Sequence, residues 1–152
     1  MQLTTEAHIE YTLGKSLGLL ATRFSRVLLR RIDTAFAQHG FAITAHQYSF
    51  LVQLWDRNGL PQGVLAEKTA RDKTTMTRLA AGLESANLIV RLPSPGDSRE
   101  RLVFLTDQGK ELMDRATAVV RDILAEAQQG IDEEQLEICR EVLRNACRNL
   151  QK

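Results

Sequence analysis

Apolar residues near the start of the chain recur at helical spacing. Steps of four and three residues separate them, which indicates an amphipathic helix between residues 11 and 40. The stripe consists of Leu13, Leu17, Leu20, Phe24 and Val27. Gly40 follows this stripe, and a glycine in that place is typical of a helix C-terminus.

The middle of the chain predicts three more helices and a hairpin in close succession. Thr44 and Gln47 match a capping box at the start of the second helix, which ends near Gly59. A short third helix over residues 62–69 and a tight link lead to Asp72, a typical N-cap for the fourth helix. The hairpin is predicted from two apolar runs, residues 88–92 and 101–105.

The last third of the chain predicts two long helices. Thr106 is placed to cap the first, Gly130 to break it, and Asp132 to cap the second. Each terminal helix of the chain has an apolar stripe, and a chain of 152 residues has limited means to cover both, so we expect a homodimer. The expected interface residues are Leu13, Leu17, Leu20, Leu136, Cys139, Leu143 and Leu150.

The length suits one domain that is mainly α-helical with a small β-hairpin. We expect dimerisation helices over residues 11–40 and 106–152, and a winged helix-turn-helix lobe over residues 44–105 between them. The sequence shows no secretory signal and no apolar run long enough to span a bilayer, and it has two cysteines. These features favour a cytoplasmic protein that does not enter a membrane.

Charge is unevenly distributed, although the whole chain has a net charge of only +1. Residues 68–101 hold seven basic and four acidic side chains, a local charge of +3, whereas residues 106–152 have a local charge of −3. A basic middle segment can orient the chain on a polyanion. The charge alone does not distinguish a DNA-binding segment from the ordinary solvent-exposed face of a helix.

The order helix, helix, tight turn, helix and hairpin is that of a winged helix-turn-helix, which binds DNA. Short polar side chains begin the fourth helix, where backbone N–H groups also favour phosphate, and threonine and arginine can contact bases or phosphates. The expected DNA-binding residues are Arg71, Lys73, Thr74, Thr75, Thr77, Arg78, Asp97, Ser98, Arg99 and Arg101. Arg91 and Arg101 are either phosphate contacts or ordinary strand charges.

Several motifs resemble those of the MarR (multiple antibiotic resistance regulator) family of bacterial transcription factors, over about residues 60–112. They are LAE at 65–67, DKTTMTRL at 72–79, LE at 83–84, LI at 88–89, DSR at 97–99 and LTDQG at 105–109. The resemblance implies a homodimer on a pseudopalindromic operator, usually a repressor, that small and often phenolic ligands or oxidants release. It also implies that Arg99 enters the minor groove.

Two roles are open for Asp97 in this wing. The carboxylate can pair with Arg99 and direct its side chain, or it can stabilise the turn after Pro95 through its own hydrogen bonds. Both roles are compatible with one another.

Aromatic residues and cysteines suggest two further kinds of site. Phe36, Phe41, Tyr48 and Trp55 form either the wall of a pocket for an aromatic ligand or plain core. Cys139 and Cys147 are eight residues apart, about 12 Å along one helix, so a disulfide within the helix is excluded. We expect them to be buried, with oxidation across two subunits as the alternative. The three histidines are scattered, so neither a metal site nor a cofactor is expected.

Three classes of function are compared for this sequence. A ligand-responsive, dimeric, DNA-binding repressor is the first, and a winged-helix module that docks on another protein is the second. An enzyme is not expected, because the sequence shows no nucleophile and base in a recognisable arrangement, no glycine-rich phosphate loop and no metal cluster.

Overall fold

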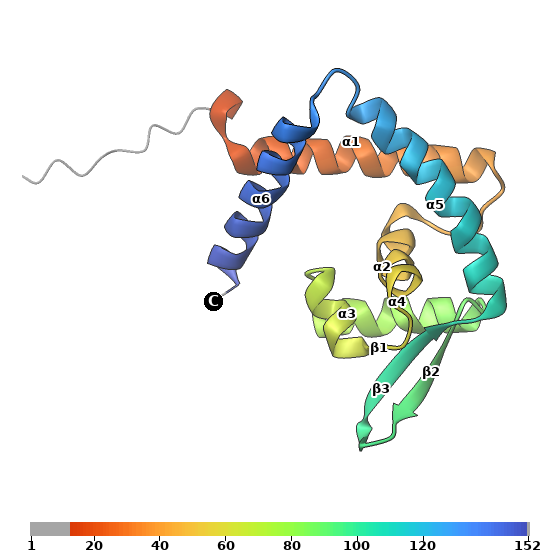
Figure 1. The fold of residues 1–152 in the computed structure, drawn as a ribbon. Coiled ribbons are helices and arrows are strands. Elements are labelled where there is room, and N and C mark those ends of the chain that lie inside the picture. The colour runs from red at the N-terminus through yellow and green to blue at the C-terminus, as the bar shows by residue number, and fades with distance from the viewer. Residues whose placement is uncertain (1–12, 152) are drawn as a thin grey trace, which may run out of the picture. The chain divides into compact units, whose positions relative to one another are not determined.

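The computed structural model describes residues 13–151 and confirms a mainly helical fold with a small sheet (Figure 1). In chain order the elements are a 3₁₀ helix η1 (Leu13–Lys15), α1 (Leu17–Gln38), α2 (Ala45–Asp56), β1 (Leu60–Pro61), α3 (Gln62–Lys68), α4 (Lys73–Ser85), β2 (Ile89–Ser94), β3 (Asp97–Leu105), α5 (Asp107–Ala127) and α6 (Glu133–Leu150). The chain divides into two compact units within α5, between Val119 and Val120. The single domain expected from the sequence stays a prediction.

The helix ends follow the capping residues that the sequence contains. Thr44 and Gln47 form the predicted capping box on α2, and Asp132 forms one with Gln135 on α6. Asp72 accepts a hydrogen bond from the backbone N–H of Thr75 at the start of α4. The predicted starts of these three helices are therefore confirmed.

The first helix begins later than predicted. Ser16 caps α1 by accepting a hydrogen bond from the backbone N–H of Leu19, so Leu13 lies in the short 3₁₀ helix before it. The positions expected to start the helix at residues 11 and 12 lie outside the described residues. Along α1 the stripe from Leu17 to Val27 is exposed, whereas Ile32 and Phe36 near its C-terminus are buried.

Three antiparallel strands form the sheet, in the order β1-β3-β2. The hairpin of β2 and β3 is longer at its tip than predicted, and β3 also pairs with β1 through Leu60 and Val103. Strand β1 was missed because its two residues are too short to show any alternation. Figure 1 shows the hairpin extending from the helices as a finger, which is the wing of this fold.

The base of the wing is joined tightly to the start of α5. Asn87 has a left-handed φ of 59°, and its carbonyl oxygen accepts a hydrogen bond from the Thr106 hydroxyl at 2.7 Å. The same hydroxyl oxygen accepts the backbone N–H of Gly109, as the predicted cap of α5 should. A Cβ atom at Gly109 would lie 2.1 Å from the carbonyl oxygen of Leu88, so only glycine permits this approach.

In the second unit, α6 exposes apolar side chains on a helix with many ion pairs. Arg140 bridges Glu133 and Glu137 at 2.7 and 2.9 Å, and Ile138, Val142 and Leu143 are exposed. Leu136 is half-buried, whereas Leu150 is exposed. Cys139 and Cys147 are also exposed in the single chain, so their burial, which was expected from an interface on this helix, stays a prediction. The spacing places them beside the apolar positions of α6, of which Ile138, Val142 and Leu143 are exposed.

Candidate nucleic-acid interface

Helix α4 presents its N-terminal polar face to the solvent. Its buried row, which includes Met76, Ala80 and Leu83, packs into the core. Lys73, Thr74 and the two residues at 77 and 78 are consequently exposed, as predicted for a helix that enters a groove.

Two of the threonines on this helix make hydrogen bonds within the helix. Thr75 donates its hydroxyl to Asp72 at 2.8 Å, while Thr77 donates to the carbonyl oxygen of Lys73 at 2.9 Å. The backbone and hydroxyl donors of Thr75 lower the pKa of the Asp72 carboxyl, which remains charged at neutral pH. Thr75 therefore serves the cap of α4, a role that its place in the sequence motif did not reveal.

Arg71 lies in the turn before α4 and reaches back to α2. Its Nη2 donates to Nδ1 of His46 at 2.6 Å, so this nitrogen of the imidazole is the acceptor. Arg71 as a whole is half-buried, and this hydrogen bond is exposed to solvent. Sequence reasoning placed Arg71 near DNA but did not connect it with His46, because 25 residues separate the two.

At the tip of the wing, Asp97, Ser98, Arg99 and Arg101 are all exposed. The Asp97 carboxylate accepts a hydrogen bond from the backbone N–H of Arg99 at 2.9 Å. The structure therefore shows the turn-stabilising role of Asp97, and the hydrogen bond involves the backbone of Arg99 instead of its guanidinium. The hydrogen bond orders the backbone at Arg99, whose side chain is exposed.

Arg91 on β2 is half-buried, and its guanidinium is paired within the lobe. Its guanidinium makes two parallel hydrogen bonds to Glu84 on α4, at 3.1 and 3.2 Å, and a longer one of 3.4 Å to Gln62 on α3. Arg91 lowers the pKa of the Glu84 carboxyl through these bonds. Glu84 and Gln62 were not among the expected site residues, because the sequence pattern of a hairpin does not show which helices pack beside it.

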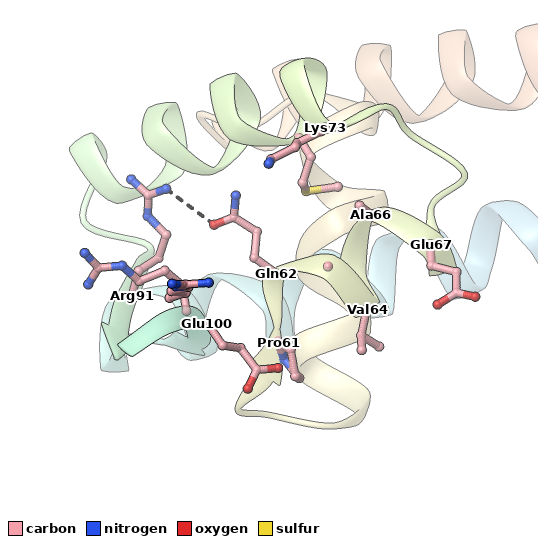
Figure 2. Close-up of a pocket in the computed structure, with 12 residues that line it drawn as sticks. Pro61, Gln62, Val64, Ala66, Glu67, Lys73, Arg91 and Glu100 are labelled. Carbon is pink, nitrogen blue, oxygen red and sulfur yellow. Dashed lines mark hydrogen bonds between the residues drawn. The ribbon is translucent and has the colours of Figure 1, made fainter. Parts of the chain in front are cut away.

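A cavity of about 630 Å³ lies between the wing and helices α3 and α4 (Figure 2). The close-up shows Lys73 from α4 and Arg91 from the wing on different sides of it. The lining residues with charged side chains are Glu67, Lys73, Arg91, Arg99, Glu100 and Arg101. Four of these six are basic, so this face of the lobe favours an anionic partner.

The four aromatic residues expected at a ligand pocket lie in different surroundings. Phe36 is fully buried, with its ring edge-on to those of Phe41 and Tyr48 at 5.6 Å, and burial raises the pKa of the Tyr48 phenol. Trp55 is exposed and donates its Nε1–H to Asp114. Phe41 lines a separate cavity of about 240 Å³ beside α5, and Arg115 lies over its ring. Phe36, Phe41 and Tyr48 therefore pack against one another, and a role of these residues in a ligand pocket stays a prediction.

Residues 13–151 contain neither a metal-ligand cluster nor a membrane-spanning helix. No group of three or more His, Cys, Asp or Glu side chains there could hold a metal ion. None of the helices in the same range is both long enough and apolar enough to cross a membrane.

Comparisons with known proteins find relatives of the winged lobe. The model of the MarR family matches residues 43–100. Transcriptional regulator HosA of Escherichia coli O111:H- is 31% identical over 87 residues, which are 57% of this chain and 64% of HosA. The chain therefore spans less than two thirds of the length of that relative.

Solved structures extend the likeness to the flanking helices. The structure of S. aureus MepR in its DNA-binding conformation has a TM-score of 0.79 and 25% identity, over 89% of this chain and 98% of MepR. CouR from Rhodococcus jostii RHA1, solved with p-coumaroyl-CoA bound, has a TM-score of 0.77 and 25% identity, over 89% of this chain and 94% of CouR. The winged lobe over residues 43–100 therefore matches the MarR family, and the chain as a whole is similar in fold to transcriptional regulators of that family.

Proposed function

We propose that the protein is a sequence-specific transcriptional regulator that binds double-stranded DNA. The observation that carries this proposal is the exposed N-terminal face of α4, where Lys73, Thr74 and Arg78 lie on the same lobe as the wing residue Arg99. Helix α4 would read the major groove, and Arg99 would enter the narrower minor groove. Such a protein acts where the DNA is, so we place it in the cytoplasm.

Fluorescence anisotropy with the DNA upstream of its own gene tests this proposal. We expect the full-length chain to bind that duplex at least tenfold more tightly than a scrambled duplex of the same composition. The Arg78→Ala variant should lose most of this preference because it loses a base contact of about 1–3 kcal/mol. Equal binding to both duplexes would contradict sequence-specific recognition.

We propose that the regulator acts as a homodimer. The stripe on α1 leaves Leu17, Leu20, Phe24 and Val27 between 48% and 58% exposed, and α6 exposes its own apolar residues. Contiguous exposed apolar residues of this size mark an interaction surface. Two lobes in one dimer would fit the two halves of a pseudopalindromic operator. Sedimentation equilibrium should give twice the chain mass, and the Phe24→Glu variant should give the mass of one chain.

Repression that a small ligand relieves is the finer part of the proposal. CouR has p-coumaroyl-CoA bound, so one protein of this fold accommodates a phenolic thioester. A screen of aromatic acids and their thioesters by thermal shift should find a compound that raises the melting temperature and weakens DNA binding. If stabilising compounds leave DNA binding unchanged, release by such a ligand is contradicted.

One observation favours a second way of switching. Cys139 and Cys147 are free and exposed, so oxidation across two subunits is chemically open to them. Treatment with peroxide followed by non-reducing electrophoresis should give a band of dimer size that the Cys139→Ser variant lacks. Docking on another protein is less favoured, because the exposed face of α4 offers threonine and basic residues where a docking surface would need apolar anchors.

A further inference from the structure

Packing does not determine the position of the wing along its whole length. Near the base, Ile89 and Val103 are buried, so the strands there are part of the core. Beyond the base, the cavity of about 630 Å³ separates the wing from α3 and α4 (Figure 2). Apolar contacts therefore hold the base of the wing but not the part that carries Arg99.

A single side chain bridges the two sides at the edge of this cavity. In the described part of the chain, every side-chain hydrogen bond from β2 and β3 to α3 and α4 comes from Arg91. Two of these bonds go to Glu84 in a parallel, two-pronged arrangement, and the third reaches Gln62, as the dashed line in Figure 2 shows. A planar guanidinium held in this way fixes direction as well as distance.

We propose that Arg91 is a positioning residue that sets the angle of the wing relative to α4. This role rests on the DNA binding proposed above. Arg91 would set the distance between Arg99, which contacts the minor groove, and the residues of α4 that contact the major groove. The Arg91 side chain is 21% exposed and the Glu84 side chain 42%, so water screens their interaction less than that of a fully exposed pair.

The competing role for Arg91, a direct phosphate contact, predicts the opposite effect of removing Glu84. If Arg91 binds phosphate, the Glu84→Ala variant frees its guanidinium and removes a negative charge, so binding to DNA becomes tighter. If Arg91 positions the wing, the same variant loosens the wing and binding becomes weaker. The sign of one measurement therefore separates the two roles.

The test compares full-length variants on duplexes that the wild-type protein selects from a random pool. For the Arg91→Ala and Glu84→Ala variants we expect affinity about fivefold weaker. Both should lose base preference at the flanking positions under the wing and keep it at the positions under α4. The double variant should be no worse than either single variant, because the two residues form one interaction.

Three controls keep the result interpretable. Glu67 lines the same cavity but makes no hydrogen bond to Arg91 in the described structure, so the Glu67→Ala variant removes the same charge without disturbing the bridge. Its flanking preference should stay that of the wild type. The Arg91→Lys variant keeps the charge but not the two-pronged geometry, and we expect it to lose the preference. Thermal unfolding of each variant shows that the chain is folded.

Two results would overturn the proposal. One is a Glu84→Ala variant that binds as tightly as the wild type or more tightly with its flanking preference unchanged. The other is an Arg91→Lys variant with full flanking preference, since charge alone would then suffice. If the wild type selects no sequence from the pool, the proposed DNA binding itself fails, which is a different outcome from either of these.

Discussion

The two ends of the wing are built from the same strands but are held in different ways. At the base, Asn87, Thr106 and Gly109 join the hairpin to α5 through hydrogen bonds and a backbone contact that excludes any side chain. At the tip, the side chains are exposed, and Asp97 fixes only the backbone of the turn. From this difference we expect the base of the wing to contribute to the stability of the fold, and the tip to contribute to the proposed DNA binding.

The largest effect on this comparison should come from the Gly109→Ala substitution at the base. The new Cβ would lie 2.1 Å from the carbonyl oxygen of Leu88, so α5 must move away from the hairpin. We expect a loss of about 2–4 kcal/mol in the free energy of unfolding, measured by urea denaturation. Gly82→Ala is the matched control, because a Cβ there meets nothing within 4 Å and alanine favours a helix. Equal stability of the two variants would contradict the close approach at Gly109.

The Thr106→Val substitution should have a smaller effect at the same place. It removes the hydroxyl that donates to Asn87 and accepts from Gly109, and it keeps the shape of the side chain. We expect the protein to lose about 1–2 kcal/mol in the free energy of unfolding. The Thr74→Val variant, which changes an exposed threonine on α4, serves as the control and should unfold like the wild type. Equal free energies of unfolding for the Thr106→Val and Thr74→Val variants would contradict a stabilising role of the Thr106 hydroxyl at the base of the wing.

At the tip, the Arg99→Ala substitution should act on binding alone. We expect about tenfold weaker binding on every duplex and a salt dependence that is shallower by about one unit in the log–log slope. The free energy of unfolding should stay within about 0.5 kcal/mol of the wild type because the side chain is exposed. An unchanged slope would show that Arg99 does not neutralise a phosphate charge or enter a groove.

The smallest effect should come from Asp97→Ala. This substitution removes the carboxylate that accepts the backbone N–H of Arg99, so the turn at the tip is less ordered before binding. We expect less than about 1 kcal/mol of lost stability and a loss of DNA affinity smaller than that of the Arg99 variant. The Asp97→Asn variant keeps an acceptor oxygen and should restore most of the affinity. If the Asn variant is as weak as the Ala variant, the charge of Asp97 is what matters.

Much of the fold was predictable because its signals are local. Thr44, Asp72 and Asp132 each mark a helix start within four residues of chain, and the structure uses all three as caps. The partners of Arg91 and Arg71 were not predictable from the sequence. They lie 7, 25 and 29 residues away, at Glu84, His46 and Gln62, and no periodicity connects such pairs. Exposed residues such as Arg99 were found by motif, and their roles stay predictions.

Strand β2 has a consequence for the solubility of the protein. It lies at an edge of the sheet, and Val90 and Leu92 are exposed on it, so its unpaired backbone groups could add a strand from another molecule. Pro93 lacks the backbone N–H that such pairing needs, and the register shifts between Pro93 and Ser94. Pro93 removes one hydrogen bond that an added strand would need, so we expect this edge to pair less readily with another molecule.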